Sequence, residues 1–246
     1  MGLTARGINS VILDIEGTTT PIEFVHSFLF DYVKRNVTSF LRNNFDKPEV
    51  AACIGKIIDI PDLPPEFRPQ NRNVASENTL ENVSYAIKYL VEKDSKATPL
   101  KEIEGFMWEE GYRNGSIRGE VYDDVLEAIK RWRNAKMRIY IYSSGSALSQ
   151  RLLFSTTVHG DLTIYIDGFF DTAVGKKTDP ESYGRISERI GEDKKNLIFI
   201  SDADREILAA RESGMHALLI NRNPDPDSGI KTGEFIKDLR DRLVIP

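Results

Sequence analysis

The sequence predicts an α/β fold, in which a mainly parallel, doubly wound sheet is interrupted by an all-helical insertion. Four short runs rich in β-branched residues are continuously apolar, as expected for parallel strands buried on both faces: SVILDI, MRIYIYS, NLIFISD and HALLIN. Between the first two runs, from about Thr19 to Gly119, apolar residues recur at helical spacing and no comparable strand is found. This stretch is too long for a single crossover connection.

The insertion is predicted to begin after the first strand with a long amphipathic helical stretch near Pro21, PIEFVHSFLFDYVKRNVTSFLRNNF. A Pro-rich loop, IPDLPPEFRPQN, precedes two more helical patterns, LENVSYAIKYLVEKD and PLKEIEGFMWEEGYRNG. Pro99 suits the first turn of the latter helix, where its missing N–H costs nothing. We therefore expect a helical domain over residues 19–119, inserted into a core formed by residues 1–18 and 120–246.

The core resumes with VYDDVLEAIKRWRNA, a helix that leads into the second strand. Three further helical patterns, SALSQRLLF, PESYGRISERIG and DREILAARESG, alternate with the remaining strands, and a weaker strand is expected within GFFDTAV. Such alternation predicts right-handed crossovers and helices on both faces of the sheet.

Composition excludes several classes of protein. The chain has 246 residues, a formal net charge of -5 and no long basic run, so we do not expect it to bind nucleic acid. No apolar run is long enough to span a membrane, and MGLTARGINS lacks the apolar core of a signal peptide, so a cytoplasmic location is expected. Cys53 is the only cysteine, and its apolar surroundings predict a packing role.

Candidate catalytic residues follow the predicted strands, because ligands of open α/β sheets bind beyond the carboxyl ends of the strands. The first strand ends in Asp14-Ile15-Glu16, and alternation along a strand would place both carboxylates on one side. Ser143 and Ser144 follow the second strand and precede a helix, an arrangement that suits a phosphate. Asp202 ends the next strong strand, where it would complete a set of oxygen ligands for magnesium.

Each of these residues also has a structural interpretation. A single Asp or Ser after a strand commonly caps a helix, and Lys176 and Lys177 would each usually be surface charge. Together, at one edge of one sheet, they predict phosphoryl transfer. Asp14 would attack phosphorus to form an aspartyl-phosphate, and Glu16 would protonate the leaving oxygen and then activate water. Magnesium and Lys177 would offset the negative charge of the phosphate.

These motifs resemble those of the haloacid dehalogenase superfamily, in the order DIEGT, Ser143, Lys177 and Asp202. The resemblance implies a Rossmann-like core with a helical cap domain in the insertion. DIEGTTTPIEFV, MWEEGYRNGSIRGEVYDDV, IYIYSSGSALSQRLLF and FFDTAVGKK are similar, more narrowly, to the enolase-phosphatase family of methionine salvage. That family converts 2,3-diketo-5-methylthiopentyl-1-phosphate to its enol phosphate, then to the acireductone 1,2-dihydroxy-3-keto-5-methylthiopentene and phosphate.

The resemblance also implies roles by position. Asp14 and Asp202 would bind one Mg²⁺ per monomer through their side chains, and Glu16 would do so through its backbone carbonyl. Ser143, Ser144 and Lys177 would hold the substrate phosphate, with Lys177 preferred over the adjacent Lys176. Glu206, which follows Asp202, would support the metal ligands without binding the metal. The expected partner is a small phosphorylated molecule.

Three alternatives remain open at this point. The chain could be a phosphatase of the same superfamily for another small phosphorylated metabolite, a dehalogenase, or a non-catalytic binding protein that kept the fold. The three histidines are scattered and predict no zinc site. The tryptophans, in helical patterns, favour core positions, although Phe24, Phe28 or Trp108 could contact an apolar substrate tail.

Overall fold

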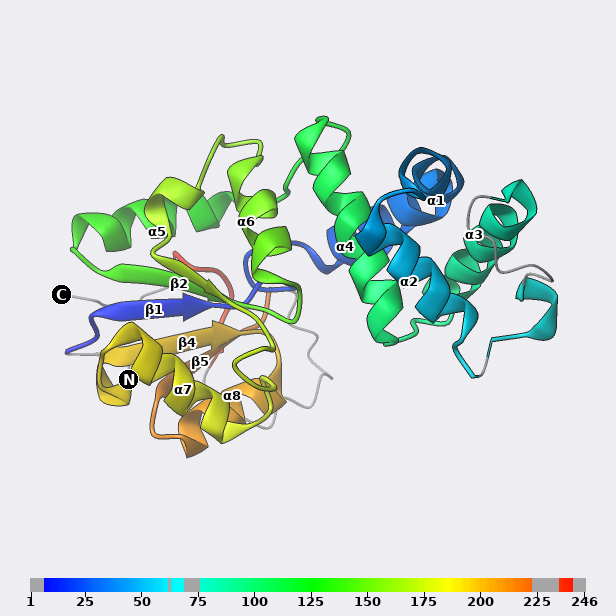
Figure 1. Ribbon diagram of the computed structural model, residues 1–246. Helices are drawn as coiled ribbons and strands as arrows, with labels where there is room; N and C mark the ends of the chain where they lie inside the picture. Colours follow the sequence, from blue (N-terminus) through cyan, green and yellow to red (C-terminus); the bar gives the residue numbers. More distant parts are fainter. Residues whose placement is uncertain (1–6, 62, 69–75, 223–234, 241–246) are drawn as a thin grey trace. The chain divides into compact units, whose positions relative to one another are not determined.

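The computed structural model describes residues 7–61, 63–68, 76–222 and 235–240. The chain divides into two compact units, each treated separately below (Figure 1). Met1–Ile22 and Arg118–Pro246 form the sheet unit, and Glu23–Ile117 form the helical unit. Within the described residues, no helix is both long and apolar enough to cross a membrane. Residues 1–6, on which the prediction about the N-terminus partly rested, lie outside the described residues.

The sheet unit is built on a six-stranded sheet with the order β3-β2-β1-β4-β5-β6, in which each described pair of neighbours is parallel. Its strands are β1 (Ser10–Leu13), β2 (Arg138–Tyr142), β3 (Gly168–Phe170), β4 (Leu197–Ser201), β5 (His216–Ile220) and β6 (Phe235–Ile236). The predicted α/β fold with a mainly parallel sheet is therefore confirmed. The sequence pattern did not predict β6, whose two residues are too few to show a periodicity.

The register of the central strands brings their carboxyl ends to one edge. Leu13, the last residue of β1, lies opposite Ile141 of β2 and Ile200 of β4. All four residues of β1 are buried, as are all five of β4, which explains the continuous apolar runs. The segments that follow these three strands therefore leave the sheet at the same edge.

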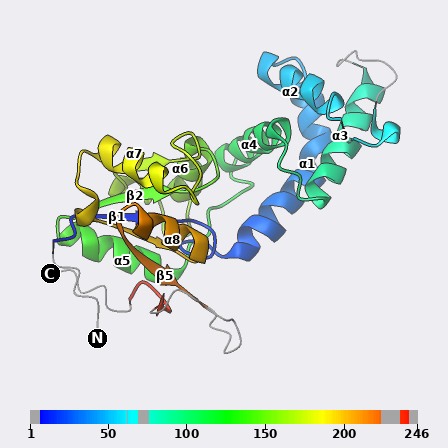
Figure 2. The same ribbon diagram turned by 90° about the horizontal axis from the view of Figure 1, so that it is seen from below.

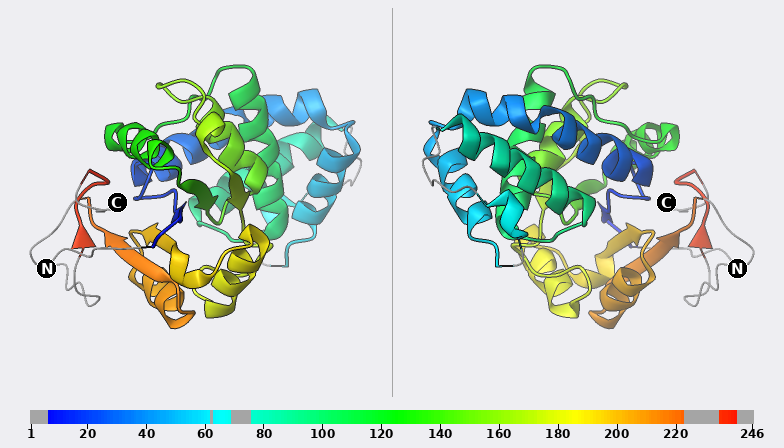
Figure 3. Two further views of the ribbon diagram at one scale, coloured as in Figure 1. Left: turned by 90° about the vertical axis from the view of Figure 1, so that its left-hand side faces the viewer. Right: turned by 90° about the vertical axis from the view of Figure 1, so that its right-hand side faces the viewer.

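Helices cover both faces of this sheet. Figures 1 and 3 show α5 (Asp123–Asn134) and α6 (Ala147–Ser155) on one side, with α7 (Pro180–Ile190) and α8 (Asp204–Glu212) on the other. Local sequence explains the ends of α7: Asp179 caps its first turn, Pro180 occupies the first helical position, and Gly191 ends it with a φ of 71°. Tyr183 of α7 stacks edge-on against Phe199 of β4, with ring centroids 5.2 Å apart.

The described residues of the helical unit form a π-helix, a short 3₁₀-helix and four α-helices, which Figure 2 shows in a second orientation. Their bounds are η1 (Phe24–Leu29), α1 (Phe30–Asn44), α2 (Pro48–Ile58), η2 (Pro65–Phe67), α3 (Glu77–Glu92) and α4 (Thr98–Arg113). The predicted helix near Pro21 is thus a π-helical turn that continues into α1. Pro99 lies in the first turn of α4, as expected. The helix α2 was not predicted from the sequence.

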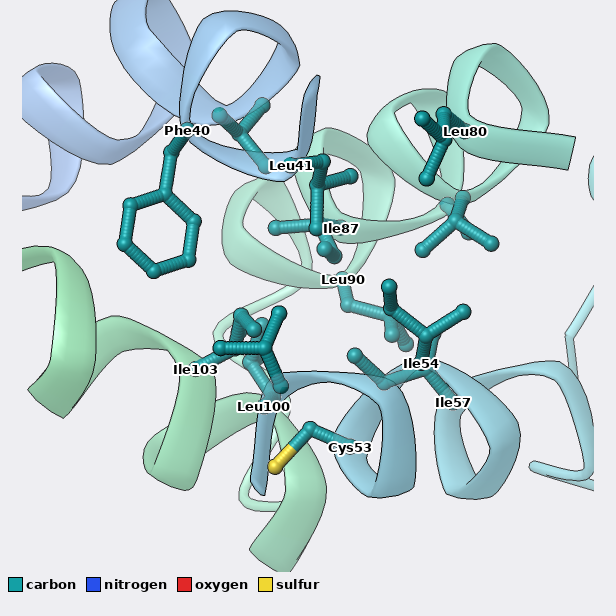
Figure 4. Close-up of a cluster of buried hydrophobic side chains, with 14 of the residues drawn as sticks. Phe40, Leu41, Cys53, Ile54, Ile57, Leu80, Ile87, Leu90, Leu100 and Ile103 are labelled. Atoms are coloured by element: carbon teal, nitrogen blue, oxygen red, sulfur yellow. The ribbon is translucent and has the colours of Figure 1, made fainter. Parts of the chain in front are cut away.

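The core of the helical unit is apolar and draws on all four α-helices, as the side chains in Figure 4 show. Ile54 and Ile57 of α2 meet Ile87 of α3 and Leu100 of α4 in this core, and each is fully buried. Cys53 lies at its margin with 2% of its surface exposed. Burial, aided by a hydrogen bond to Glu102, raises the pKa of the Cys53 thiol to about 12. The thiol therefore stays protonated and packs as an apolar group.

Candidate active site

Asp14 lies immediately after β1 and is 3% exposed. Its Oδ1 accepts hydrogen bonds from the backbone N–H of Ile15 at 2.7 Å and from Lys177 Nζ at 2.5 Å. Its Oδ2 accepts one from the Ser201 hydroxyl at 3.2 Å. A buried carboxylate needs such partners to remain charged. These contacts fix the orientation of the Asp14 carboxylate at the edge where the strands end.

The turn after Asp14 is tightly hydrogen-bonded. The backbone N–H groups of Thr18, Thr19 and Thr20 all donate to the carbonyl of Ile15, and the Thr19 hydroxyl donates to the carbonyl of Asp14. The strand ends at Leu13, so strand alternation does not extend to Glu16. β1 ends two residues before the apolar run SVILDI ends at Ile15, so a shared side for the carboxylates of Asp14 and Glu16 stays a prediction. Glu16 is half-buried and forms a backbone bridge with Thr20.

Lys177 lies between two carboxylates. Its Nζ is 2.5 Å from Asp14 Oδ1 and 2.7 Å from Glu206 Oε2, and 10% of its side chain is exposed. Burial acts to lower the pKa of Lys177, but the charges of Asp14 and Glu206 outweigh burial and raise it. The neighbouring Lys176 is exposed. Of the two lysines in GKK, it is thus the second whose charge lies beside Asp14.

The loop that carries Lys177 is held by side chains of neighbouring elements, which donate hydrogen bonds to its backbone carbonyls. Tyr183 of α7 donates its hydroxyl to the carbonyl of Lys177 at 2.6 Å, and Tyr142 of β2 donates to the carbonyl of Gly175 at 3.0 Å. Gly175 has a φ of +135°, and a Cβ there would lie 2.1 Å from the Ser182 hydroxyl. Only glycine fits this backbone, so the sequence GKK combines a required turn with the lysine.

Asp202 follows β4 and lies against the turn after Asp14. Its backbone N–H donates to the Thr18 hydroxyl at 3.0 Å. A Cβ added at Gly17, whose φ is +66°, would lie 2.1 Å from Asp202 Oδ2, so the carboxylate occupies the space that glycine leaves. Burial, together with the negative charge of Asp14, raises the pKa of the Asp202 carboxyl to about 7. The two carboxylates are therefore electrostatically coupled.

Glu206, in the first turn of α8, contacts the same cluster. Its Oε2 accepts a hydrogen bond from the Ser201 hydroxyl at 2.8 Å and pairs with Lys177. Burial and the charge of Asp14 raise its pKa. Ser201 thus donates to one of two carboxylates, Asp14 or Glu206, and links them. Ser201 is the last residue of β4, and no role was predicted for it from the sequence.

The charge of this cluster fits a divalent cation. Asp14, Asp202 and Glu206 contribute three carboxylates, and Lys177 offsets only one of them. Carboxylate and carbonyl oxygens are the ligands that Mg²⁺ prefers. Among the described residues, no group of three or more His, Cys, Asp or Glu side chains could hold a metal ion. The expected set uses only two side chains, those of Asp14 and Asp202, with the carbonyl of Glu16.

The serines after β2 differ in exposure. Ser143 is 4% exposed, its backbone N–H donates to the carbonyl of Phe170 at 3.1 Å, and its hydroxyl accepts from Gly145 N at 3.4 Å. Ser144 is exposed. The cap of α6 is Ser146, whose hydroxyl accepts from the backbone N–H of Ser149 at 3.2 Å. Helix capping therefore does not account for Ser143 or Ser144, and their role in phosphate binding stays a prediction.

Other residues considered from sequence lie elsewhere. Trp132 is fully buried in α5. In the helical unit, Phe24 is 5% and Phe28 46% exposed, with ring centroids 5.3 Å apart. The indole N–H of Trp108 donates to the carbonyl of Leu29 at 3.2 Å. Phe28 is the one of these three candidate aromatics whose ring is largely exposed.

Comparisons with known proteins identify the family of this chain. A family model for haloacid dehalogenase-like hydrolases matches residues 8–214. An enolase-phosphatase E1 of Persephonella marina is 42% identical over 89% of this chain and 90% of its own length. An enolase-phosphatase E1 of Drosophila melanogaster is 36% identical over 98% of this chain and 94% of its own.

Solved structures share the fold of this chain. The UTR4 protein of Saccharomyces cerevisiae superposes with a TM-score of 0.73 at 31% identity, covering 97% of this chain and 100% of the other. The L-2-haloacid dehalogenase RSc1362, at a TM-score of 0.54 and 15% identity over 96% of both chains, shares the fold alone. The chain belongs to the haloacid dehalogenase-like hydrolases, and within them to the enolase-phosphatase E1 family.

Proposed function

We propose that this phosphatase converts 2,3-diketo-5-methylthiopentyl-1-phosphate to its enol phosphate and then to the acireductone 1,2-dihydroxy-3-keto-5-methylthiopentene and phosphate, in methionine salvage. The observation that carries the phosphatase half is the buried contact of Asp14 with Lys177, at 2.5 Å. A protein that only bound ligands would have no need for an oriented carboxylate paired with a cation. The support for the substrate is the identity to enolase-phosphatases over most of the chain.

In the proposed phosphatase reaction, the Asp14 carboxylate attacks phosphorus and forms an aspartyl-phosphate. The bond from phosphorus to the ester oxygen breaks, and Glu16 gives its proton to that oxygen. Glu16 then takes a proton from the water that attacks the aspartyl-phosphate, which releases phosphate and restores Asp14. Lys177 offsets the charge of the transferred group, and Ser143 and Ser144 hold its oxygens.

We propose Asp14, Asp202 and the carbonyl of Glu16 as the ligands of one Mg²⁺, with Glu206 supporting them through Ser201 and Lys177. When bound, the ion would polarise oxygens of the substrate and neutralise their charge. Its support is the excess of carboxylates over lysine around Asp14. Chelation should abolish phosphate release, and added Mg²⁺ should restore it, whereas release that persists in chelator would contradict the proposal.

The decisive test incubates the purified protein with the diketone phosphate and Mg²⁺, and follows enol formation by absorbance and phosphate by a chemical assay. Asp14→Asn should lower phosphate release by several orders of magnitude while the circular-dichroism spectrum is retained, because an amide cannot form the aspartyl-phosphate. Unchanged release would remove Asp14 from the mechanism. Enol formation that persists in Glu16→Gln would exclude Glu16 as the base that removes the carbon-bound proton.

A second candidate is a phosphatase of the same superfamily for another small phosphorylated metabolite. The contacts of Asp14 would serve either substrate, since they involve only the phosphate-transfer chemistry. A panel of sugar phosphates and nucleotides separates the two functions. Faster turnover of any of these than of the diketone phosphate would favour the second candidate.

We further propose that the helical unit serves as the cap domain, and that the protein acts as a cytoplasmic monomer. The support is the family resemblance and a single cysteine, which suits a reducing compartment. Sedimentation should give a mass near the 27.9 kDa of one chain. A dimer at micromolar concentration would contradict the monomer.

A further inference from the structure

Arg222, two residues beyond the end of β5, reaches the turn that follows the nucleophile. Its Nε donates to the carbonyl of Thr18 at 2.9 Å, and its Nη2 donates to the same oxygen. Its Nη1 contacts both oxygens of Asp124, at 3.0 and 3.2 Å. The side chain of Arg222 is 11% exposed and that of Asp124 is 2% exposed. One buried guanidinium therefore joins the nucleophile turn to the start of α5.

The surroundings hold this guanidinium in one orientation. It lies over the ring of Tyr122, 3.8 Å from the centroid. The backbone N–H of Tyr122 donates to the carbonyl of Thr19 at 3.0 Å, and the second oxygen of Asp124 also accepts from the backbone N–H of Leu239 at 2.6 Å. A planar fork of five donors can satisfy a carboxylate and a carbonyl at once, which a lysine ammonium at this distance cannot do in the same geometry.

Thr18 connects Arg222 to the reacting groups. The Thr18 carbonyl accepts two hydrogen bonds from the guanidinium, from Nε and Nη2. The Thr18 hydroxyl accepts one from the backbone N–H of Asp202. The next residue, Thr19, donates its hydroxyl to the carbonyl of Asp14. The orientation of the Thr18 peptide is thereby coupled to the backbone positions of both Asp14 and Asp202.

We infer that Arg222 is a positioning residue of the phosphatase, which acts through Thr18 to fix the turn between Asp14 and Asp202. The inference rests on the proposed function for its consequence in catalysis. A displacement of reacting groups by about 1 Å can cost a hundredfold in rate. Because Ser143, Ser144 and Lys177 lie on other segments, loss of Arg222 should lower kcat and weaken Mg²⁺ activation while leaving KM nearly unchanged.

The test compares Arg222→Met and Arg222→Lys with Asp124→Asn. All three disturb the pair of Arg222 with Asp124, but Asp124→Asn keeps the guanidinium on Thr18. We expect kcat to fall at least tenfold in both Arg222 variants and less than threefold in Asp124→Asn. The Mg²⁺ concentration for half-maximal activity should rise in parallel with the fall in kcat. Arg222→Lys retains a cation beside Asp124, so it should fold even if Arg222→Met does not.

A second readout does not depend on activity. Hydrogen–deuterium exchange of the metal-free protein reports on the amides of Thr18, Thr19, Thr20 and Asp202, which should exchange at least tenfold faster in the Arg222 variants than in Asp124→Asn. Equal exchange in all variants, or equal kcat at matched unfolding stability, would overturn the inference. If the wild-type protein released no phosphate, the proposed function would fail, and the exchange rates would still decide whether Arg222 orders the turn.

Discussion

Gly17→Ala tests the close approach of the turn after Asp14 to the Asp202 side chain. Gly17 has a φ of +66°, a conformation that costs an L-residue roughly 1–2 kcal/mol. The added Cβ would lie 2.1 Å from Asp202 Oδ2 and 2.6 Å from its Cγ. Ordinary van der Waals contact begins at 3.4 Å, so the carboxylate must retreat by about 1.3 Å. Gly17→Ala should therefore have two separate effects, which are strain in its own backbone and a displacement of the Asp202 carboxylate.

The chain offers a control that carries the strain alone. Gly191, at the end of α7, has a φ of +71°, and a Cβ there would meet no atom within 4 Å. Gly17→Ala and Gly191→Ala should therefore share the strain term, about 1–2 kcal/mol of unfolding free energy in urea. Only Gly17→Ala should lose activity. A displacement of about 1 Å corresponds to roughly a hundredfold in kcat/KM, or about 2.7 kcal/mol in the barrier.

The assay is phosphate release from the diketone phosphate at saturating Mg²⁺, with unfolding followed by circular dichroism on the same samples. We expect Gly191→Ala to stay within twofold of wild type in kcat/KM. The reasoning fails if Gly17→Ala retains wild-type kcat/KM, since Asp202 would then tolerate displacement, or if both variants lose activity equally.

Two further predictions concern buried charges. Lys177→Met should leave Asp14 and Glu206 without their cation, costing about 3–5 kcal/mol of stability and most phosphate release, whereas Lys176→Met should change neither measurably; equal effects of the two variants would contradict the site. In the helical unit, burial raises the pKa of Glu104 to about 7 from its usual 4.5, so its contribution to stability is complete below about pH 4.5 and is lost as pH rises through 7. At pH 8, the free energy of unfolding of Glu104→Gln in urea should therefore exceed that of the wild type by roughly 3 kcal/mol or less. A wild-type free energy of unfolding that does not fall between pH 5 and 8 would refute this prediction.

Much of the fold could be predicted because its strands are continuous apolar runs. SVILDI and NLIFISD could only be buried parallel strands or core helices, and their length and β-branching favoured strands. The helix α2 was missed although it was predictable, because a proline lies in its first turn and its buried residues recur at three- and four-residue spacing: Val50, Cys53, Ile54, Ile57 and Ile58. The π-helical turn over Phe24–Leu29, in contrast, leaves no signal in a pattern of three- and four-residue spacings.

The candidate site was predictable as a set of strand ends but not as a set of contacts. Asp14 and Lys177 are 163 residues apart, and only the resemblance favoured Lys177 over Lys176 before the structure placed its Nζ on Asp14. The contact of Gly17 with Asp202 and the hydrogen bonds from Arg222 to Thr18 depend on the path of the turn in three dimensions. No local spacing encodes these contacts, so neither Thr18 nor Arg222 was given a role from the sequence.

The position of β1 in the sheet has a consequence for the order in which the protein is made. Both neighbours of this strand come from beyond the insertion, since Ser10 pairs with Arg138 and with Leu197. During synthesis, the segment before Asp14 must therefore wait for β2 and β4 to leave the ribosome. If the helical unit folds in the meantime, it shortens the loop to be closed, and each halving of that loop saves about 0.6 kcal/mol of closure entropy. Asp14 is therefore translated well before the two strands that complete its surroundings.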